Sequence, residues 1–173
     1  MRYAALAVLG FTLLITQAAV GVLMPLDEWA PNLLLPIVIY LGVSHDVPVV
    51  RGAALSFLLG YLLDSFCGSP MGLQTFVMVA SYLIARGAGL NLFMRGPPLQ
   101  IVTTFVFGLI AGGSILALRA IFEPPAPFPL DGATDTVVAV LLGASVTALL
   151  APPLFATIRR VDGLATRRRE ESA

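Results

Sequence analysis

The stretch GAALSFLLGYLLDSFCGSPMG, residues 52–72, decides the fold class of this chain. Gly52, Ser56, Gly60 and Asp64 recur at every fourth position, and in an α-helix this spacing places small or polar groups along one side. Leucine dominates the positions between them, so the rest of the helix surface is apolar. The glycine, serine and proline that follow predict a turn. We interpret the stretch as a packing centre between membrane helices rather than as a catalytic loop.

The composition places the whole chain in a membrane. Of its 173 residues, 58% are hydrophobic and 12% are charged, and the mean hydropathy is +0.92. Soluble domains carry about 25% charged residues, so a chain this apolar cannot cover a surface in water. Its one cysteine, Cys67, excludes an internal disulfide and a cysteine metal cluster.

Six apolar runs divide the chain, and about 20 residues suffice to cross the hydrocarbon core. The runs cover residues 1–24, 32–43, 52–63, 72–84, 99–118 and 136–158. They predict an all-α, polytopic fold of about six transmembrane helices in one domain, residues 1–158, followed by a basic cytoplasmic tail, residues 159–173. We expect the first run to be retained as a membrane helix; a cleaved signal peptide is the alternative.

The second and third runs are short for a membrane crossing. Pro36 lies within the second run and is expected to kink or weaken it. The alternative to two short spanning helices is a re-entrant pair. Pro152 and Pro153 are expected to kink the sixth run near its end.

The arginines predict the orientation, because basic residues are enriched in cytoplasmic loops. With six alternating runs, one side holds nine of the ten basic residues, all arginine: Arg2, Arg51, Arg86, Arg95, Arg159, Arg160, Arg167, Arg168 and Arg169. The other side holds Arg119 with Asp27, Glu28, Asp64, Glu123, Asp131 and Asp135. This partition predicts that both termini are cytoplasmic, and it favours six helices over five or seven.

We find no catalytic or metal-binding pattern in the sequence. His45 has no nucleophile pattern near it, and it is interpreted as a loop residue, as Cys67 is interpreted as a small turn residue. There is no phosphate-binding glycine motif and no His or Cys pair with metal spacing. We therefore expect no enzymatic activity and no cofactor.

Asp64 is the strongest single candidate, because acids within membrane segments are costly and often functional. The favoured interpretation is structural: its carboxylate caps or bridges the turn over residues 68–72. Direct contact with a partner protein and proton or ion translocation are the alternatives. A Gly108-x-x-x-Gly112 pair in the fifth run predicts close helix packing within the chain, with a dimer face as the alternative. The arginines of the tail predict an anchor among anionic lipid headgroups, or else a docking site for a cytoplasmic protein.

Two segments resemble a known family. PNLLL at residues 31–35, followed by VIYL at residues 38–41, is similar to the start of the second helix in the MreD family. These are the rod shape-determining integral membrane proteins of bacterial cell-wall elongation. GYLLD at residues 60–64, followed by GSPMGL at residues 68–73, is similar to the most recognisable segment of that family. The length and the six-helix layout also resemble it.

The resemblance implies a non-enzymatic scaffold of the cell-wall elongation complex in the bacterial inner membrane. Its expected partner is an MreC-like single-span protein, which would connect it to an MreB-like filament, a RodA-like glycosyltransferase and a class B penicillin-binding protein. The family fold is similar to the S components of energy-coupling-factor transporters. The residues expected to form the partner-binding or packing motif are Pro31, Asn32, Gly52, Ser56, Gly60, Asp64, Gly68, Pro70 and Gly72.

Two other functions are compatible with the residues. A small-solute-binding S component would need a polar pocket, for which Asn32, Asp64, Gln74 and Thr75 are the candidates. A proton- or ion-coupled transporter would depend on Asp64.

Overall fold

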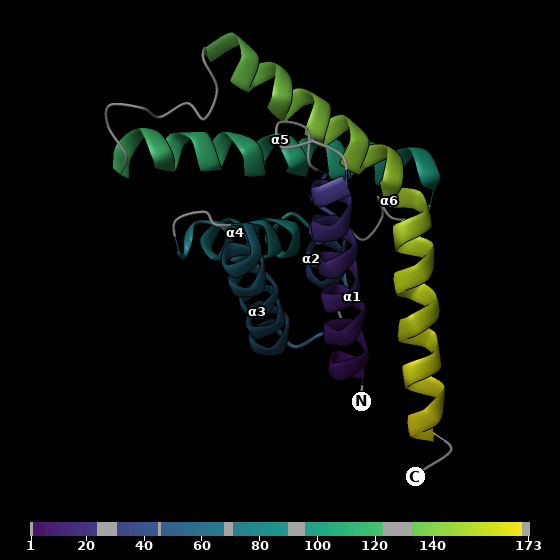
Figure 1. Cartoon of the computed structure of the whole chain (residues 1–173). Helices are drawn as coiled ribbons and strands as arrows, with labels where there is room; N and C mark the ends of the chain where they lie inside the picture. The colour runs from purple at the N-terminus through teal and green to yellow at the C-terminus, as the bar shows by residue number, and fades with distance from the viewer. Residues whose placement is uncertain are drawn as a thin grey trace.

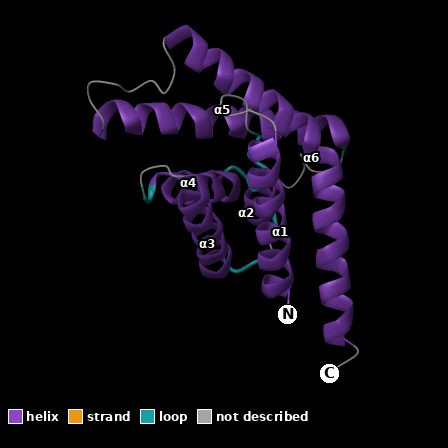
Figure 2. Cartoon of the chain, in the orientation of Figure 1, coloured by secondary structure: helices purple, strands orange, loops and turns teal. Residues whose placement is uncertain are grey.

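The computed structural model of the chain describes residues 2–23, 31–44, 46–67, 71–89, 96–122 and 133–170. Regular structure in these residues is helical throughout (Figures 1 and 2). The helices are α1 (Arg2–Leu23), α2 (Leu35–Val43), α3 (Val49–Cys67), α4 (Leu73–Gly87), α5 (Pro97–Phe122) and α6 (Ala133–Glu170). The predicted all-α fold is confirmed.

Four of the helices are long and apolar enough to cross a membrane. The candidate spans are Arg2–Val20, Val49–Phe66, Pro97–Ile121 and Thr134–Leu164. The other two helices are shorter: α2 has 9 residues and α4 has 15, which at 1.5 Å per residue gives about 14 Å and 22 Å. The hydrocarbon core is about 30 Å thick, so α2 and α4 each cover only part of it.

The short helix α2 lies at the centre of the molecule. Eight of its residues are buried, with Tyr40 the exception, and it packs against α3, α4, α5 and α6. The expectation that Pro36 kinks this helix is wrong, because the helix begins at Leu35 and the proline falls in its first turn. There a proline costs little, since its missing N–H would have no helical partner.

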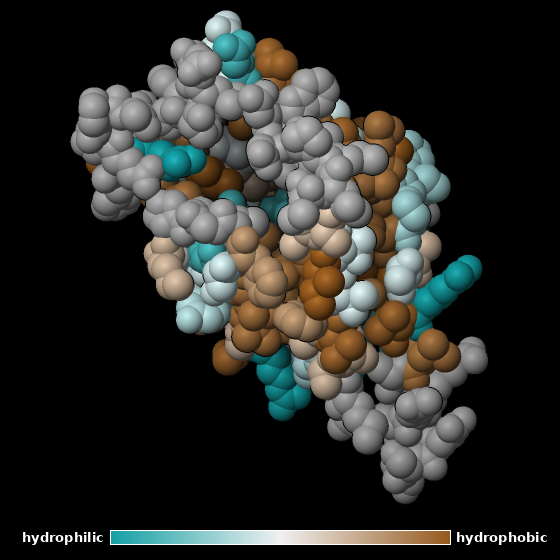
Figure 3. All heavy atoms as spheres, viewed as in Figure 1, coloured by the Kyte–Doolittle hydropathy of each residue, from teal (hydrophilic) through white to brown (hydrophobic). Residues whose placement is uncertain are grey.

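Around α2 the helices form two close pairs, α3 with α4 and α5 with α6, and α1 packs against both α3 and α6. In Figure 1, α5 runs across the molecule above α4, at a steep angle to α1. On the face shown in Figure 3, hydrophobic residues cover most of the described part, and hydrophilic residues stand mainly at its periphery. An apolar core and an apolar exterior together match the lipid environment that the composition predicts.

The start of α1 and the end of α6 lie at the same end of the molecule (Figure 1). Arg2 of α1 pairs there with Asp162 of α6, and the Arg51 guanidinium of α3 lies 5.6 Å from the centre of the Tyr3 ring. These contacts bring the first turns of α1 and α3 together with the last third of α6.

The opposite end has polar contacts of its own. The backbone N–H of Leu33 donates to Gln17 Oε1 over 3.0 Å, and the N–H of Asn32 donates to Thr147 Oγ1 over 3.0 Å. The end of α1 thus meets the start of α2 and the middle of α6. Successive helices α1 and α2 therefore run in opposite directions, and so do α1 and the C-terminal part of α6.

Helix α6 consists of two straight parts that meet at a sharp bend (Figure 1). We call the parts before and after the bend its N-terminal and C-terminal legs. Pro152 and Pro153 lie inside the helix, and each removes one helical hydrogen bond and crowds the preceding turn. The sixth run, expected to end at residue 158, continues as helix to Glu170. The first part of the predicted tail is therefore helical.

The pair α5 and α6 is held together at glycines. A Cβ added at Gly112 would lie 2.5 Å from Val140 Cγ1, and one at Gly108 would lie 3.0 Å from the Ala144 Cβ. The Gly108-x-x-x-Gly112 pattern thus serves close approach within the chain. Gly113, the neighbour of Gly112, has nothing within 4 Å of the corresponding position.

The two adjacent glycines make a matched test. We expect Gly112→Ala to destabilise the protein by about 1–3 kcal/mol, because the new methyl group overlaps the stiff, β-branched Val140. Gly113→Ala should be neutral, or stabilising by up to about 1 kcal/mol, because alanine favours the helix and meets no neighbour. Unfolding of the two variants in mild detergent measures the difference. Equal stability of both variants would contradict the packing described here.

Candidate functional site

The side chain of Asp64, near the end of α3, accepts four hydrogen bonds from the beginning of α4. Its Oδ1 accepts the N–H of Gln74 over 2.9 Å. Its Oδ2 accepts the N–H groups of Gly72 and Thr75, each over 3.0 Å, and the Thr75 hydroxyl over 2.6 Å. The residue is 2% exposed. The first N–H groups of a helix have no partner within it, so Asp64 caps α4 from the neighbouring helix.

This arrangement is the structural interpretation that the sequence favours for Asp64. The backbone at Gly72 has a φ of +98°, in the left-handed region that favours glycine, and so lets the chain enter α4 at this angle. Gly68 and Pro70, which belong to the same predicted motif, lie outside the described residues.

At Gly60, one turn before Asp64, α3 lies directly against the backbone of α4. A Cβ at this position would lie 2.6 Å from the Thr75 Cα and 3.1 Å from the Gln74 carbonyl oxygen. Both neighbours are backbone atoms, so neither can rotate away. The carboxylate of Asp64 reaches the start of α4 because Gly60 lets the two backbones come this close.

The rest of the predicted stripe also faces α4. A Cβ at Gly52 would collide with the ring of Tyr82, whose hydroxyl donates to the Val49 carbonyl oxygen over 3.1 Å. Ser56 lies between the two glycines and is fully buried, and its hydroxyl has no hydrogen-bond partner in the described part of the chain. The position therefore requires a small side chain rather than a polar one.

Pro31 and Asn32 lie away from this pair of helices, at the entry to α2. The Asn32 side chain accepts the Leu34 N–H over 3.2 Å, and its backbone N–H donates to Thr147 of α6. Asn32 thus orders the turn before α2 and docks it on α6. Pro31 is partly buried beside it. The predicted motif residues that the structure describes fall into two separate structural sites, the α3–α4 contact and the start of α2.

A third polar cluster was missed by the sequence analysis. Asp162 of α6 is 8% exposed, pairs with Arg2 of α1, and accepts the Tyr40 hydroxyl of α2 over 2.8 Å. The sequence analysis assigns it to the predicted tail, residues 159–173. Its position four residues after the buried Ile158 indicates that it shares the inward face of the helix, and this signal is visible in the sequence.

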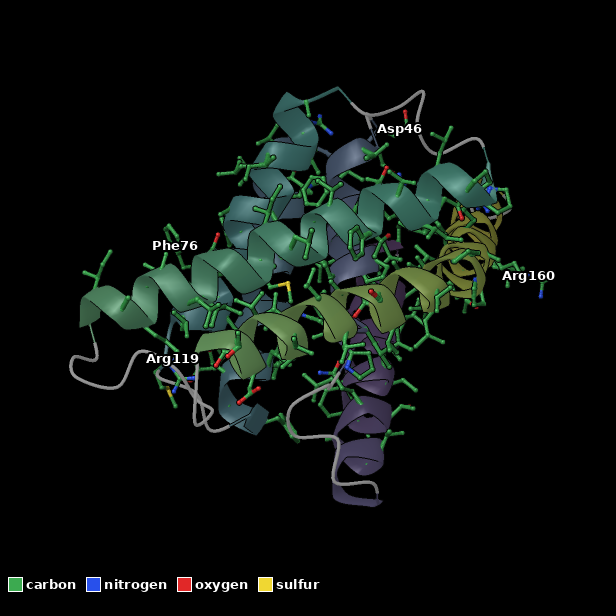
Figure 4. The ribbon with its side chains drawn as sticks, turned by 90° about the horizontal axis from the view of Figure 1, so that it is seen from above. Asp46, Phe76, Arg119 and Arg160 are labelled. Atoms are coloured by element: carbon green, nitrogen blue, oxygen red, sulfur yellow. The ribbon has the colours of Figure 1, made fainter. Side chains whose placement is uncertain are left out.

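Two arginines predicted for the cytoplasmic side have structural contacts. Arg86 of α4 donates through Nη1 to the Ser44 carbonyl oxygen over 2.7 Å, at the end of α2, and Arg51 stacks on Tyr3. In Figure 4, Arg160 points away from the helices on the side opposite Arg119.

The described residues contain no group of three or more His, Cys, Asp or Glu side chains that could hold a metal ion. His45 lies outside the described residues. The described sites position helices relative to one another. They do so through a cross-helix cap, close backbone contacts and a polar cluster that joins three helices.

These features define the class: a polytopic, all-helical membrane protein whose polar residues position helices. The chain belongs to the family of the rod shape-determining protein MreD, whose model matches residues 2–161 of the 173. It is therefore a determinant of rod shape, in a family of structural membrane proteins that is not a known enzyme family. No curated protein and no solved structure matches the chain, so the similarity to transporter S components stays a prediction.

Removal of the Asp64 charge tests the cap. In Asp64→Asn, one carboxylate oxygen becomes an NH2 donor that faces backbone N–H donors, so we expect a loss of roughly 2–4 kcal/mol in unfolding free energy. Asp46→Asn, an exposed acid in the connection after α2 (Figure 4), is the control and should change little. Thermal or denaturant unfolding in detergent provides the measurement. An Asp64→Asn protein as stable as the control would exclude the cap as a source of stability.

Ser56→Ala separates size from polarity at the α3–α4 contact. Because the buried hydroxyl has no partner in the described residues, its removal should leave stability unchanged or raise it by up to about 1 kcal/mol. The same unfolding assay applies. A clear destabilisation would show that the hydroxyl makes a bond that this packing does not include.

Proposed function

We propose that this protein is a non-enzymatic membrane scaffold of the bacterial cell-wall elongation complex, and that it acts by binding an MreC-like single-span protein. Membership of the MreD family supports a role in cell-wall elongation. The α3–α4 pair supports partner binding as the way in which the protein acts. That pair is held in one arrangement by Gly60 and Asp64, so it presents a preformed surface. A preformed surface lowers the cost of ordering on binding.

The observation that carries the proposal is the outer face of this pair. Exposed aromatic side chains lie on both helices: Phe57 and Tyr61, one turn apart on α3, and Phe76 on α4, with exposed fractions between 47% and 61%. Lipid offers no hydrophobic drive between helices, so a partner helix associates through shape and close packing. A fixed pair of helices with large side chains on its outer face provides such a shape.

The MreC-like protein would in turn connect this protein to the other members of the complex. Through an MreC-like protein the scaffold would connect to an MreB-like filament, a RodA-like glycosyltransferase and a class B penicillin-binding protein. We place the protein in the bacterial inner membrane with both termini in the cytoplasm. The ion pair between Arg2 and Asp162, which holds the beginning of α1 beside the end of α6, supports a common side for the termini. The distribution of arginine supports the cytoplasm as that side.

Co-purification from native membranes in mild detergent tests this function. We expect tagged protein to recover a single-span protein with a large extracytoplasmic domain. Gly60→Leu should reduce its recovery at least tenfold, because the added side chain overlaps the Thr75 backbone and displaces α4. Membrane insertion of this variant should be intact.

A surface variant separates partner binding from folding. Phe76→Ala removes an aromatic side chain that is 61% exposed, so it should lower partner recovery several-fold with little loss of stability. Phe11→Ala, which removes an exposed phenylalanine from α1, is the matched control and should retain the partner. Full recovery with both Gly60→Leu and Phe76→Ala would reject the α3–α4 surface. Recovery of an ATPase pair with a transmembrane coupling subunit would reject the scaffold.

A further inference from the structure

The cluster of Arg2, Tyr40 and Asp162 joins three helices that are distant in sequence. Both carboxylate oxygens of Asp162 are engaged by the Arg2 guanidinium, and the contact from Arg2 Nη2 to Asp162 Oδ2 measures 2.7 Å. Tyr40 donates its hydroxyl to the same Oδ2 over 2.8 Å. The Arg2 side chain is 22% exposed and that of Asp162 is 11% exposed. A two-pronged arginine–carboxylate pair with a further donor is among the stronger polar contacts in proteins, because it fixes both distance and direction.

The element that carries Asp162 is the C-terminal leg of α6, which follows the bend. Two consecutive prolines inside a helix remove two backbone hydrogen bonds, so the helix resists bending least at this point. A leg joined to its helix through such a bend needs contacts of its own to hold its direction. Phe155 and Ile158 supply apolar ones, since both are fully or almost fully buried.

Apolar contacts alone leave the direction of the leg weakly specified. In a membrane, a leg that swings away from the bundle exchanges protein contacts for lipid contacts of the same apolar kind. The Asp162 carboxylate is different, because departure of the leg would break a directional ion pair and a hydrogen bond that no lipid contact replaces. Asp162 therefore favours one direction of the leg in a way that Phe155 and Ile158 do not.

We propose that Arg2, Tyr40 and Asp162 form a latch that fixes the C-terminal leg of α6 against α1 and α2. The bend at Pro152–Pro153 is the hinge of this leg, and the latch selects one of its directions. The latch also makes the position of the C-terminal leg of α6 depend on α1. This inference goes beyond the proposed scaffold function and holds whichever partner the protein binds.

Distance measurements on the full-length chain in detergent or nanodiscs test the latch. Spin labels would be attached to Leu164→Cys on the leg and Val50→Cys at the start of α3, in a Cys67→Ser background. Both side chains are exposed, at 65% and 79%, so the labels should not disturb packing. We expect one narrow distance distribution for the protein with an intact latch. Asp162→Asn should broaden it or add a second, separate distance.

Three further variants distinguish a latch from general packing. Arg160→Gln removes a neighbouring exposed charge that points away from the helices (Figure 4), and it should leave the distribution narrow. The charge exchange Arg2→Asp with Asp162→Arg should restore much of the narrow distribution that either single change loses. Tyr40→Phe removes one hydrogen bond and keeps the ion pair, so it should broaden the distribution only slightly. It also gives a readout should Asp162→Asn fail to fold.

The unfolding temperature provides a second test of the latch. We expect Asp162→Asn to lower the unfolding temperature by roughly 5 °C more than Arg160→Gln does, with partial recovery in the charge exchange. A narrow, unchanged distance in Asp162→Asn would overturn the proposal. So would a charge exchange that recovers neither the distance nor the unfolding temperature, because packing alone would then account for the position of the leg.

Discussion

The arrangement of α3 and α4 depends on a single carboxylate that satisfies the beginning of a helix. The first N–H groups of α4 have no partner inside the helix, and lipid offers none. Asp64 supplies acceptors for three of these backbone groups and for the Thr75 hydroxyl. An acid at this depth is costly when isolated, but here its charge faces the positive end of the α4 dipole. The same contact thus offsets two costs, an unpaired helix start and a buried charge.

This contact requires that two backbones approach closely, and the small residues of α3 allow it. Gly60 brings α3 against the backbone of Thr75, which places the Asp64 carboxylate within reach of α4. Gly52 admits the ring of Tyr82 at the other end of the same interface. The four-residue spacing of Gly52, Ser56, Gly60 and Asp64 therefore marks the side of α3 that faces α4. The small residues set the distance between α3 and α4. The carboxylate of Asp64 fixes the register of the two helices, that is, their relative position along the helix axes.

Much of this was predictable from residues 52–72, because helical periodicity reports directly which positions share a face. The all-α fold, the packing role of Gly52 and Gly60 and the capping of the turn by Asp64 follow from local spacing. The spacing of Asp162 from Ile158 indicates that it faces inward, but its pairing with Arg2 and Tyr40 carries no local signal, because these partners are more than 100 residues away. Pro36 was misinterpreted for a related reason: its effect depends on where α2 begins, and helix boundaries are the least certain feature of a sequence.

The polar contacts between helices that are described above gather near the two ends of the molecule, and the buried centre between them is mainly apolar. Asp64, Asn32 and Gln17 act at one end; Asp162, Arg86 and Arg51 act at the other. Because lipid and protein interiors are equally apolar, the central contacts alone favour close packing without selecting one arrangement. Directional contacts at both ends select it. The scaffold function proposed above would need such a fixed arrangement, with the apolar outer faces of the helices available to a partner.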